Sequence, residues 1–343
     1  MPFDDGRLDD ETILARHDAP LRHQAEAGAR VRREAVAAEQ GVADAVTVLG
    51  SSRPRAVIAA GPDSRLLRAV LEPVCPVPFL AWPGPGLPAW AGPLDLVVVL
   101  APDGGDPGTA RGVAEASRRG CAQVVACPAE SLVAEHATGR STIVLPTATG
   151  DQLATAVVVL ELLDRLGLAP QTDPERVAAA LDQVAISCGP HQDLAVNPAK
   201  IAAIGIAETS PLLWGGTVLA ARAGRRIAEA IRRATGRAAL AADAEHLLPV
   251  LEAAVPADIF ADPFTDGVGE SRPALVVLED GFDDPMVRTT RDRLVDTART
   301  HGVRVEYVGT SADIVADGEV CRYAALLATG TYAAAYLRIG AVD

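Results

Sequence analysis

One stretch in the second half of the chain combines a single carboxylate with many arginines. An apolar run over residues 211–215 precedes a helix-like segment, 217–235, which carries Glu229 together with Arg222, Arg225, Arg226, Arg232 and Arg233. A carboxylate at the mouth of a parallel sheet can move a proton between two adjacent carbons of an opened sugar, and an arginine such as Arg222 can hold the charge that develops. Glu229 also lies four residues after Arg225 and three after Arg226, so a solvated salt-bridge face is the alternative.

A histidine follows this carboxylate at a distance that suits a partner in catalysis. His246 lies 17 residues after Glu229 (246 − 229). It could open a sugar ring by transferring a proton at the ring oxygen, although a structural histidine is the alternative.

Two loops in the first half have residues that could hold an anion. Ser64 follows Gly61-Pro62-Asp63 and offers either a hydroxyl to a phosphate, which the neighbouring Asp63 would repel, or a helix cap. The segment from Asp103 to Thr109 contains Gly104, Gly105 and Gly108, which leave the backbone open to a ligand, and Thr109 adds a hydroxyl. Asp103 and Asp106 place negative charge there, so a capped turn or, with less weight, a divalent-cation site are the alternatives.

The elements that must position these residues alternate between short apolar runs and helix-like segments. Runs bounded by Gly, Pro or Asp occur at 55–61, 78–82, 94–101, 123–127 and 142–145, and again at 211–215, 238–242, 274–279 and 303–308. Such runs are typical of strands covered on both faces. The alternation predicts an α/β fold with doubly wound, flavodoxin-like parallel sheets, in which ligands lie beyond the carboxyl ends of the strands.

The two halves of the chain resemble each other. Asp106-Pro107 and Asp284-Pro285 each follow an apolar run, and each opens a helix-like segment that ends near a glycine, Gly120 or Gly302. This repeat favours duplication of one fold. We expect an N-terminal helical segment over 8–50, with Gly41 as its interruption, inside a first domain, 1–168. A connector, 169–198, and a second domain, 199–343, follow.

Composition limits the class of partner. The chain has 343 residues, 49% of them hydrophobic, and a formal net charge of −14, so nucleic acid and anionic membranes are unexpected partners. The acidic N-terminus lacks the pattern of a signal peptide, and the five cysteines show no C-x-x-C pair, which predicts a cytoplasmic protein without disulfides. No nucleotide-binding or zinc-binding motif occurs, so we expect neither cofactor nor metal.

Several of these segments resemble the bifunctional phosphoglucose/phosphomannose isomerases, which have two sugar-isomerase (SIS) domains. The matching segments are Asn197-Pro198-Ala199-Lys200, Pro211–Gly215 and Ala221–Arg232, and the end of the chain resembles the family's closing G-V-D. The resemblance implies a homodimer that converts glucose 6-phosphate or mannose 6-phosphate to fructose 6-phosphate. Glu229 would be the base, His246 would open the ring, and Ser64, Gly104, Gly105, Thr109 and Arg222 would bind the substrate.

The first half departs from the family's phosphate-binding pattern. Ser64 keeps the first serine, but the S-x-S-G-x-T loop reads Ala101-Pro102-Asp103-Gly104-Gly105-Asp106, and no arginine occurs in 146–153. Lys200 is the only lysine in the chain, so none corresponds to the family's C-terminal catalytic lysine. A binding or regulatory protein that kept the fold without the chemistry therefore stays an alternative, as does an enzyme for unphosphorylated or nucleotide-linked carbohydrates.

Overall fold

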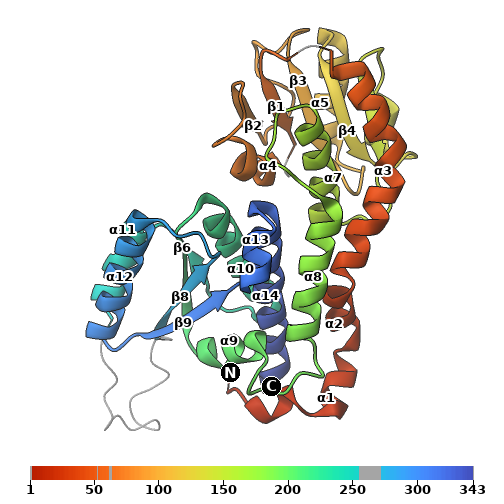
Figure 1. The fold of residues 1–343 in the computed structure, drawn as a ribbon. Helices are drawn as coiled ribbons and strands as arrows, with labels where there is room; N and C mark the ends of the chain where they lie inside the picture. The colour runs from red at the N-terminus through yellow and green to blue at the C-terminus, as the bar shows by residue number, and fades with distance from the viewer. Residues whose placement is uncertain (1, 52, 62–63, 255–271, 343) are drawn as a thin grey trace. The chain divides into compact units, whose positions relative to one another are not determined.

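The chain forms two compact units, each built around its own parallel sheet (Figure 1). The computed structural model describes residues 2–51, 53–61, 64–254 and 272–342. The first unit is Ala27–Ala179, and the second unit combines Met1–Glu26 with Ala180–Asp343. By contacts, therefore, the first 26 residues group with the second half of the chain, whereas the sequence suggested that they belong to the first domain.

The sheet of the first unit has five strands in the order β2-β1-β3-β4-β5, and all neighbours are parallel. The strands are β1 (Val57–Ala60), β2 (Phe79–Trp82), β3 (Leu96–Leu100), β4 (Ala122–Cys127) and β5 (Thr142–Pro146). Every residue of β1 and β3 is buried, as continuously apolar central strands require. This strand order is the flavodoxin-like one, so the predicted fold class is confirmed.

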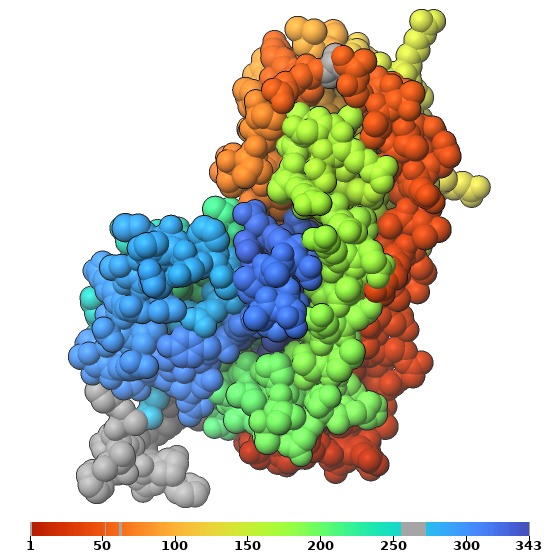
Figure 2. Space-filling model, viewed as in Figure 1, coloured from red at the N-terminus to blue at the C-terminus, as the bar shows by residue number. Residues whose placement is uncertain are grey.

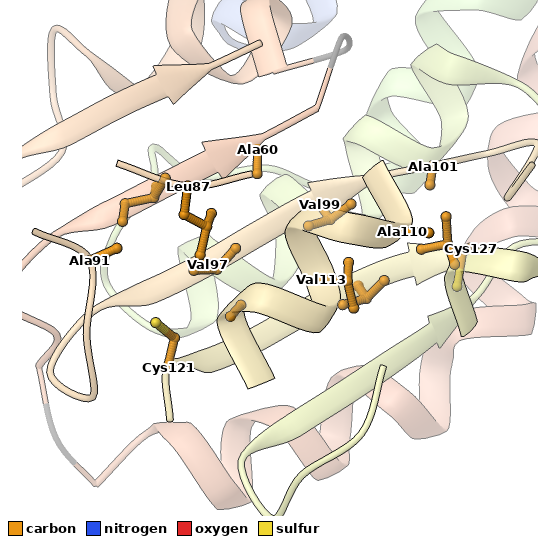
Figure 3. Packing of buried hydrophobic residues seen from close by; sticks show 14 residues of the cluster. Ala60, Leu87, Ala91, Val97, Val99, Ala101, Ala110, Val113, Cys121 and Cys127 are labelled. Atoms are coloured by element: carbon orange, nitrogen blue, oxygen red, sulfur yellow. The ribbon is translucent and has the colours of Figure 1, made fainter. Parts of the chain in front are cut away.

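Helices cover this sheet, and small side chains let them approach it closely. They are α3 (Ala27–Leu49), α4 (Ser64–Leu71), α5 (Pro107–Arg119), α6 (Leu132–His136) and α7 (Gln152–Arg165). Helix α8 (Pro174–Cys188) follows them and continues into the second unit. Ala110 and Val113 of α5 pack in one buried cluster with Val97 and Val99 of β3 (Figure 3). In Figure 2, α3 (red to orange) lies beside α7 (yellow-green).

The prediction that Gly41 interrupts the N-terminal helical segment is wrong. Helix α3 runs through Gly41, and the segment is interrupted earlier, at His17 and at Glu26. A Cβ atom on Gly41 would lie 3.0 Å from Leu145 Cδ2 and 3.2 Å from the Val144 carbonyl oxygen. The glycine is therefore explained by close packing of α3 on β5, a reason that helix propensity alone does not reveal.

The second unit repeats the architecture with four parallel strands in the order β7-β6-β8-β9. The strands are β6 (Ser210–Gly215), β7 (Leu240–Ala241), β8 (Pro273–Glu279) and β9 (Arg304–Gly309). The helices are η1 (Asp5–Leu8), α1 (Glu11–Arg16), α2 (Asp18–Ala25), α9 (Pro198–Ile206), α10 (Val218–Thr235), α11 (Ala244–Glu252), α12 (Pro285–Thr300), α13 (Ala312–Ala316) and α14 (Glu319–Gly340). Helices α9 and α13 were not predicted.

The two similar segments found in the sequence occupy corresponding positions in the two sheets. In each sheet the first strand along the chain, β1 or β6, lies between the second and the third, and β3 or β8 is the third. Asp106 caps α5 and Asp284 caps α12, each followed by a proline, and Gly120 and Gly302 have φ angles of 71° and 67° near the helix ends. The shared strand order and helix signals support duplication of one fold.

Candidate functional site

In the first unit, the chain reverses its direction of winding between β1 and β3, which is where open α/β sheets bind ligands. The loops that follow these two strands lie against each other. A Cβ atom built on Gly61, after β1, would lie 3.3 Å from Oγ1 of Thr109, in the first turn of α5. The sequence-predicted residues Ser64, Gly104, Gly105 and Thr109 all belong to these two loops or to the helices that they open.

Ser64 is the first residue of α4, and its hydroxyl is buried without a partner. The residue is 1% exposed, and its Oγ forms no hydrogen bond with any described residue. It therefore does not cap the helix, which was the alternative left by the sequence; Pro62 and Asp63, which precede it, lie outside the described residues. Buried hydroxyls in proteins nearly always have a partner, so this one marks a place where a ligand atom or water would be bound.

Both hydrogen-bond donors of Thr109 bind Asp106, the N-cap residue of α5. Its hydroxyl and its amide both donate to Asp106 Oδ2, at 2.6 and 2.7 Å. These bonds, with help from the Gly108 amide and against the effect of partial burial, hold the pKa of Asp106 below its ordinary value. The N-terminus of α5 is thus already occupied by a charged carboxylate of the chain itself, and the capped-turn alternative describes this loop.

The two predicted glycines of this loop differ in what surrounds them. Gly104 is buried with φ at +64°, and a Cβ atom there would lie 2.4 Å from Cβ of Ser131 and 2.9 Å from Cδ of Pro128. Its missing side chain is therefore explained by packing. Gly105 is exposed, and the nearest atom to its Cβ position is the Asp103 carbonyl oxygen at 4.0 Å. Of these two glycines, Gly105 is the one beside open space.

A buried glutamate that the sequence analysis missed occupies the loop after β5. Glu34 of α3 is 1% exposed and accepts four hydrogen bonds, from the amides of Ala148 and Thr149 and from the hydroxyls of Thr149 and Thr155, at 2.8 to 3.2 Å. This donor set would suit an external anion, but the chain fills it with its own carboxylate. The signal was present in the sequence, because Glu34 lies on the buried face of α3 with Val31, Ala38 and Val42.

The same helix brings an arginine to this loop. Arg30, one turn before Glu34, is 7% exposed, and its Nε lies 2.6 Å from Oδ2 of Asp151, the cap of α7. No arginine occurs within the loop itself, so α3 provides the guanidinium that stands beside it. Arg30 therefore forms an ion pair with Asp151 and positions this carboxylate at the start of α7.

In the second unit, both oxygens of Glu229 are paired with arginines of its own helix. Arg226 lies 2.8 Å from Oε2 and Arg233 lies 2.5 Å from Oε1, and the Glu229 side chain is 31% exposed. Glu229 is 11 residues beyond Val218, the first residue of α10, or about 16 Å along the helix axis. The salt-bridge face is thus present, formed with Arg226 and Arg233.

The other predicted residues of the second unit are separate from Glu229. His246 is exposed in the first turn of α11, and among the described residues neither a hydrogen bond nor an ion pair joins it to Glu229. Arg222, about two turns before Glu229 on α10, hydrogen-bonds the buried hydroxyl of Tyr323. Burial raises the pKa of Tyr323, and the charges of Arg222 and Arg226 oppose that rise in part.

The second sheet also has a change of winding, between β6 and β8, and a carboxylate lies there. Asp280, after β8, is 7% exposed; its Oδ2 accepts the Thr217 hydroxyl at 2.6 Å, and Thr217 in turn caps α10 by accepting the Ala220 amide at 3.0 Å. A buried carboxylate beside this helix N-terminus disfavours an anionic ligand. Of the helix N-termini described at the two changes of winding, α4 is therefore the better place for a phosphate.

Two general properties of the described residues complete the picture. None of the helices in the described ranges is long and apolar enough to cross a membrane. Among the same residues, no three or more His, Cys, Asp or Glu side chains gather into a group that could hold a metal ion.

Comparison with known proteins defines the class of fold first. Neither a protein-family model nor a curated protein sequence matches the chain. Solved structures do match over nearly its whole length, and their names describe phosphosugar isomerases, a domain of an aminotransferase that acts on a sugar phosphate, and a sugar-binding protein. The chain therefore has the fold of this class, with a flavodoxin-like parallel sheet in each unit.

Three of the structures show how far the similarity extends. The tagatose-6-phosphate ketose/aldose isomerase of Escherichia coli is 15% identical, with a TM-score of 0.64 over 94% of this chain and 92% of that one. A protein of Salmonella typhimurium LT2 described as sugar-binding is 13% identical, with a TM-score of 0.65 over 93% and 99%. The C-terminal domain of glucosamine-fructose-6-phosphate aminotransferase from Francisella tularensis is 11% identical, with a TM-score of 0.58 over 93% and 95%.

Proposed function

We propose that the first unit binds a phosphorylated sugar between the loops that follow β1 and β3, with the Ser64 hydroxyl as a ligand of the phosphate. The observation that carries this proposal is the buried Ser64 Oγ without a partner at the N-terminus of α4. Helix N-termini favour phosphate through their amides and their dipole. The names of the similar structures, which refer to sugars and sugar phosphates, support the same class of ligand.

Ser64→Ala tests the proposal because the hydroxyl makes no hydrogen bond to any residue that the structure describes. We expect this variant to be at least as stable as the natural chain. Its affinity for glucose 6-phosphate, mannose 6-phosphate or fructose 6-phosphate should fall about 10- to 100-fold, the cost of one hydrogen bond to a charged group. Isothermal titration measures the affinity, and a thermal shift with each sugar phosphate screens for the ligand.

Ser141→Ala is the matched control, since Ser141 is exposed just before β5, at the opposite edge of the same sheet. It should bind as the natural chain does. Unchanged affinity in Ser64→Ala, or no binding of any sugar phosphate by the natural chain, would refute the proposal. A marked loss of stability in Ser64→Ala would show instead that the hydroxyl is part of the fold.

The finer form of the proposal is an aldose–ketose isomerase that converts glucose 6-phosphate or mannose 6-phosphate to fructose 6-phosphate. Glu229 would take the proton from C2 of the opened sugar and return it to C1, and His246 would open the ring, with Arg222 holding negative charge. The fold shared with a ketose/aldose isomerase supports this form. Arg226 and Arg233 each occupy one oxygen of the Glu229 carboxylate, so one of these ion pairs must open before Glu229 can take a proton from the substrate.

A coupled assay that starts from fructose 6-phosphate separates isomerisation from binding alone. Glu229→Gln should lower turnover by about 10²- to 10⁴-fold, as expected for loss of a general base. Glu161→Gln, which breaks a comparable helical pair with Arg165, should leave turnover unchanged. If the natural chain binds sugar phosphates without turnover, a binding or regulatory role stands and the isomerase form falls.

Assembly as a homodimer and a cytoplasmic location stay predictions. Light scattering coupled to gel filtration tests the first, because a dimer would double the 35.5 kDa mass of the chain. A mass that stays at the monomer value across concentrations would reject it.

A further inference from the structure

The phosphate proposed to lie at Ser64 would meet carboxylates on the opposite side of the loop pair. Asp103 and Asp106 are both exposed in the loop after β3, and aspartate side chains are ordinarily charged at neutral pH. A phosphate monoester carries about 1.5 to 2 negative charges at pH 7, so a cation is needed to balance the repulsion.

The residue next to Ser64 provides such a cation. Arg65 is the second residue of α4, is exposed, and forms no hydrogen bond or ion pair with any residue that the structure describes. The next arginine of the helix differs, because Arg68 pairs with Glu72 at 2.7 Å, and that bond raises the pKa of Arg68.

The position of Arg65 within α4 points to the same use. Cations are unfavourable in the first turn of a helix, where the dipole is positive, unless an anion is bound there. Within α4 itself, from Ser64 onward, the first turn contains no acidic residue; Asp63, which precedes it in the sequence, lies outside the described residues. Helical side chains also tilt toward the N-terminus, so the long Arg65 side chain can reach over the end of the helix where Ser64 lies.

We propose that Arg65 recognises the charge of the phosphate held at Ser64 and so selects phosphorylated sugars over neutral ones. This inference rests on the proposed function. The planar guanidinium can donate two parallel hydrogen bonds to phosphate oxygens, while the Ser64 hydroxyl donates a third. In the isomerases that the sequence resembles, hydroxyl groups of the loop after this strand bind the phosphate, and Asp103 and Asp106 stand in that loop here. Arg65 of the neighbouring helix α4 would bind the phosphate in place of those hydroxyl groups.

The test is isothermal titration of glucose 6-phosphate and of inorganic phosphate against the natural chain, Arg65→Ala, Arg68→Ala and Ser64→Ala. Arg65→Ala should weaken binding about 10- to 100-fold, as expected for loss of a charge-assisted hydrogen bond. Arg68→Ala, from the same face of the same helix, should stay within about twofold of the natural chain, as expected of a residue that is not coupled to the ligand. Arg65→Lys should restore part of the affinity because it restores the charge.

A pH series provides a readout that a purely structural role would not change. The second pKa of a phosphate monoester is about 6, so the affinity of the natural chain should rise between about pH 5 and pH 7 as the dianion forms. Arg65→Ala should lose most of this rise. Affinity within about twofold of the natural chain in Arg65→Ala, while Ser64→Ala loses binding, would overturn the role of Arg65 alone. Absence of any binding by the natural chain would overturn both proposals.

Discussion

Replacing Lys200, the only lysine in the chain, by methionine should strongly destabilise the second unit. The side chain is 0% exposed, and its Nζ donates to Asp9 Oδ1 at 2.6 Å, to the Gln192 carbonyl at 2.7 Å and to the Pro190 carbonyl at 2.9 Å. All three protons of the ammonium group are therefore used. Methionine keeps the volume of the stem but removes every donor.

The loss of stability in Lys200→Met depends on how far Asp9 and the two carbonyl groups can be hydrated once the ammonium group is removed. Removing one partner of a fully buried ion pair costs about 3–5 kcal/mol. Here the Asp9 side chain is 42% exposed and the two carbonyl-bearing residues are half-buried, so rehydration offsets part of that cost. We expect a loss of about 3 kcal/mol in the free energy of unfolding, at the lower end of that range.

Fluorescence of Trp214, a buried residue of β6, can follow unfolding of the second unit by guanidinium if Trp82 and Trp90 are first changed to phenylalanine. Arg233→Met is the control, because the Arg233 side chain is 73% exposed and its ion pair should be worth less than about 1 kcal/mol. If Lys200→Met costs no more than this control, the ammonium group does not hold the N-terminal residues in place and our reasoning is wrong.

Three further predictions concern the carboxylates and glycines of the two units. Glu34→Ala should cost about 3–5 kcal/mol of unfolding free energy because it leaves two part-buried amides and two hydroxyls without their acceptor, whereas Glu34→Gln, measured by the same denaturation, should cost about 1–2 kcal/mol. Gly104→Ala should cost about 2–4 kcal/mol from its left-handed backbone and overpacking, while Gly105→Ala should change the melting temperature little; equal effects would contradict this. Partial burial would raise the pKa of Asp9, but the hydrogen bond and charge of Lys200 lower it overall, so its contribution is present above about pH 4 and is lost as pH falls through the lowered pKa. The difference in melting temperature between the natural chain and Asp9→Asn should therefore shrink between about pH 6 and pH 3, and a difference that grows would refute the sign.

Local signals in the sequence predicted most of the fold. The helix expected over 107–119 is α5 itself, because Asp106-Pro107 fixes its start and Gly120 its end, and both signals act within one turn. Asn197-Pro198 carries the same kind of start signal and opens α9, where the Asn197 side chain accepts the amides of Ala199 and Lys200.

The site was harder to predict because its main features depend on contacts between distant segments. Glu34 lies more than 110 positions in the sequence from the amides whose hydrogen bonds it accepts, and no rule of sequence spacing links such distant residues. That Ser64 Oγ has no hydrogen-bond partner among the described residues is likewise a property of the packed structure. By contrast, the pairing of Glu229 with Arg226 follows the i, i+3 rule and was among the alternatives that the sequence suggested.

A crystal structure of the chain with glucose 6-phosphate tests the central claim most directly. We expect the phosphate between the loops after β1 and β3, with an oxygen within hydrogen-bond distance of Ser64 Oγ and the Arg65 guanidinium turned toward it. A phosphate bound elsewhere, with the Ser64 hydroxyl still buried and unpartnered beneath protein atoms, would contradict the account.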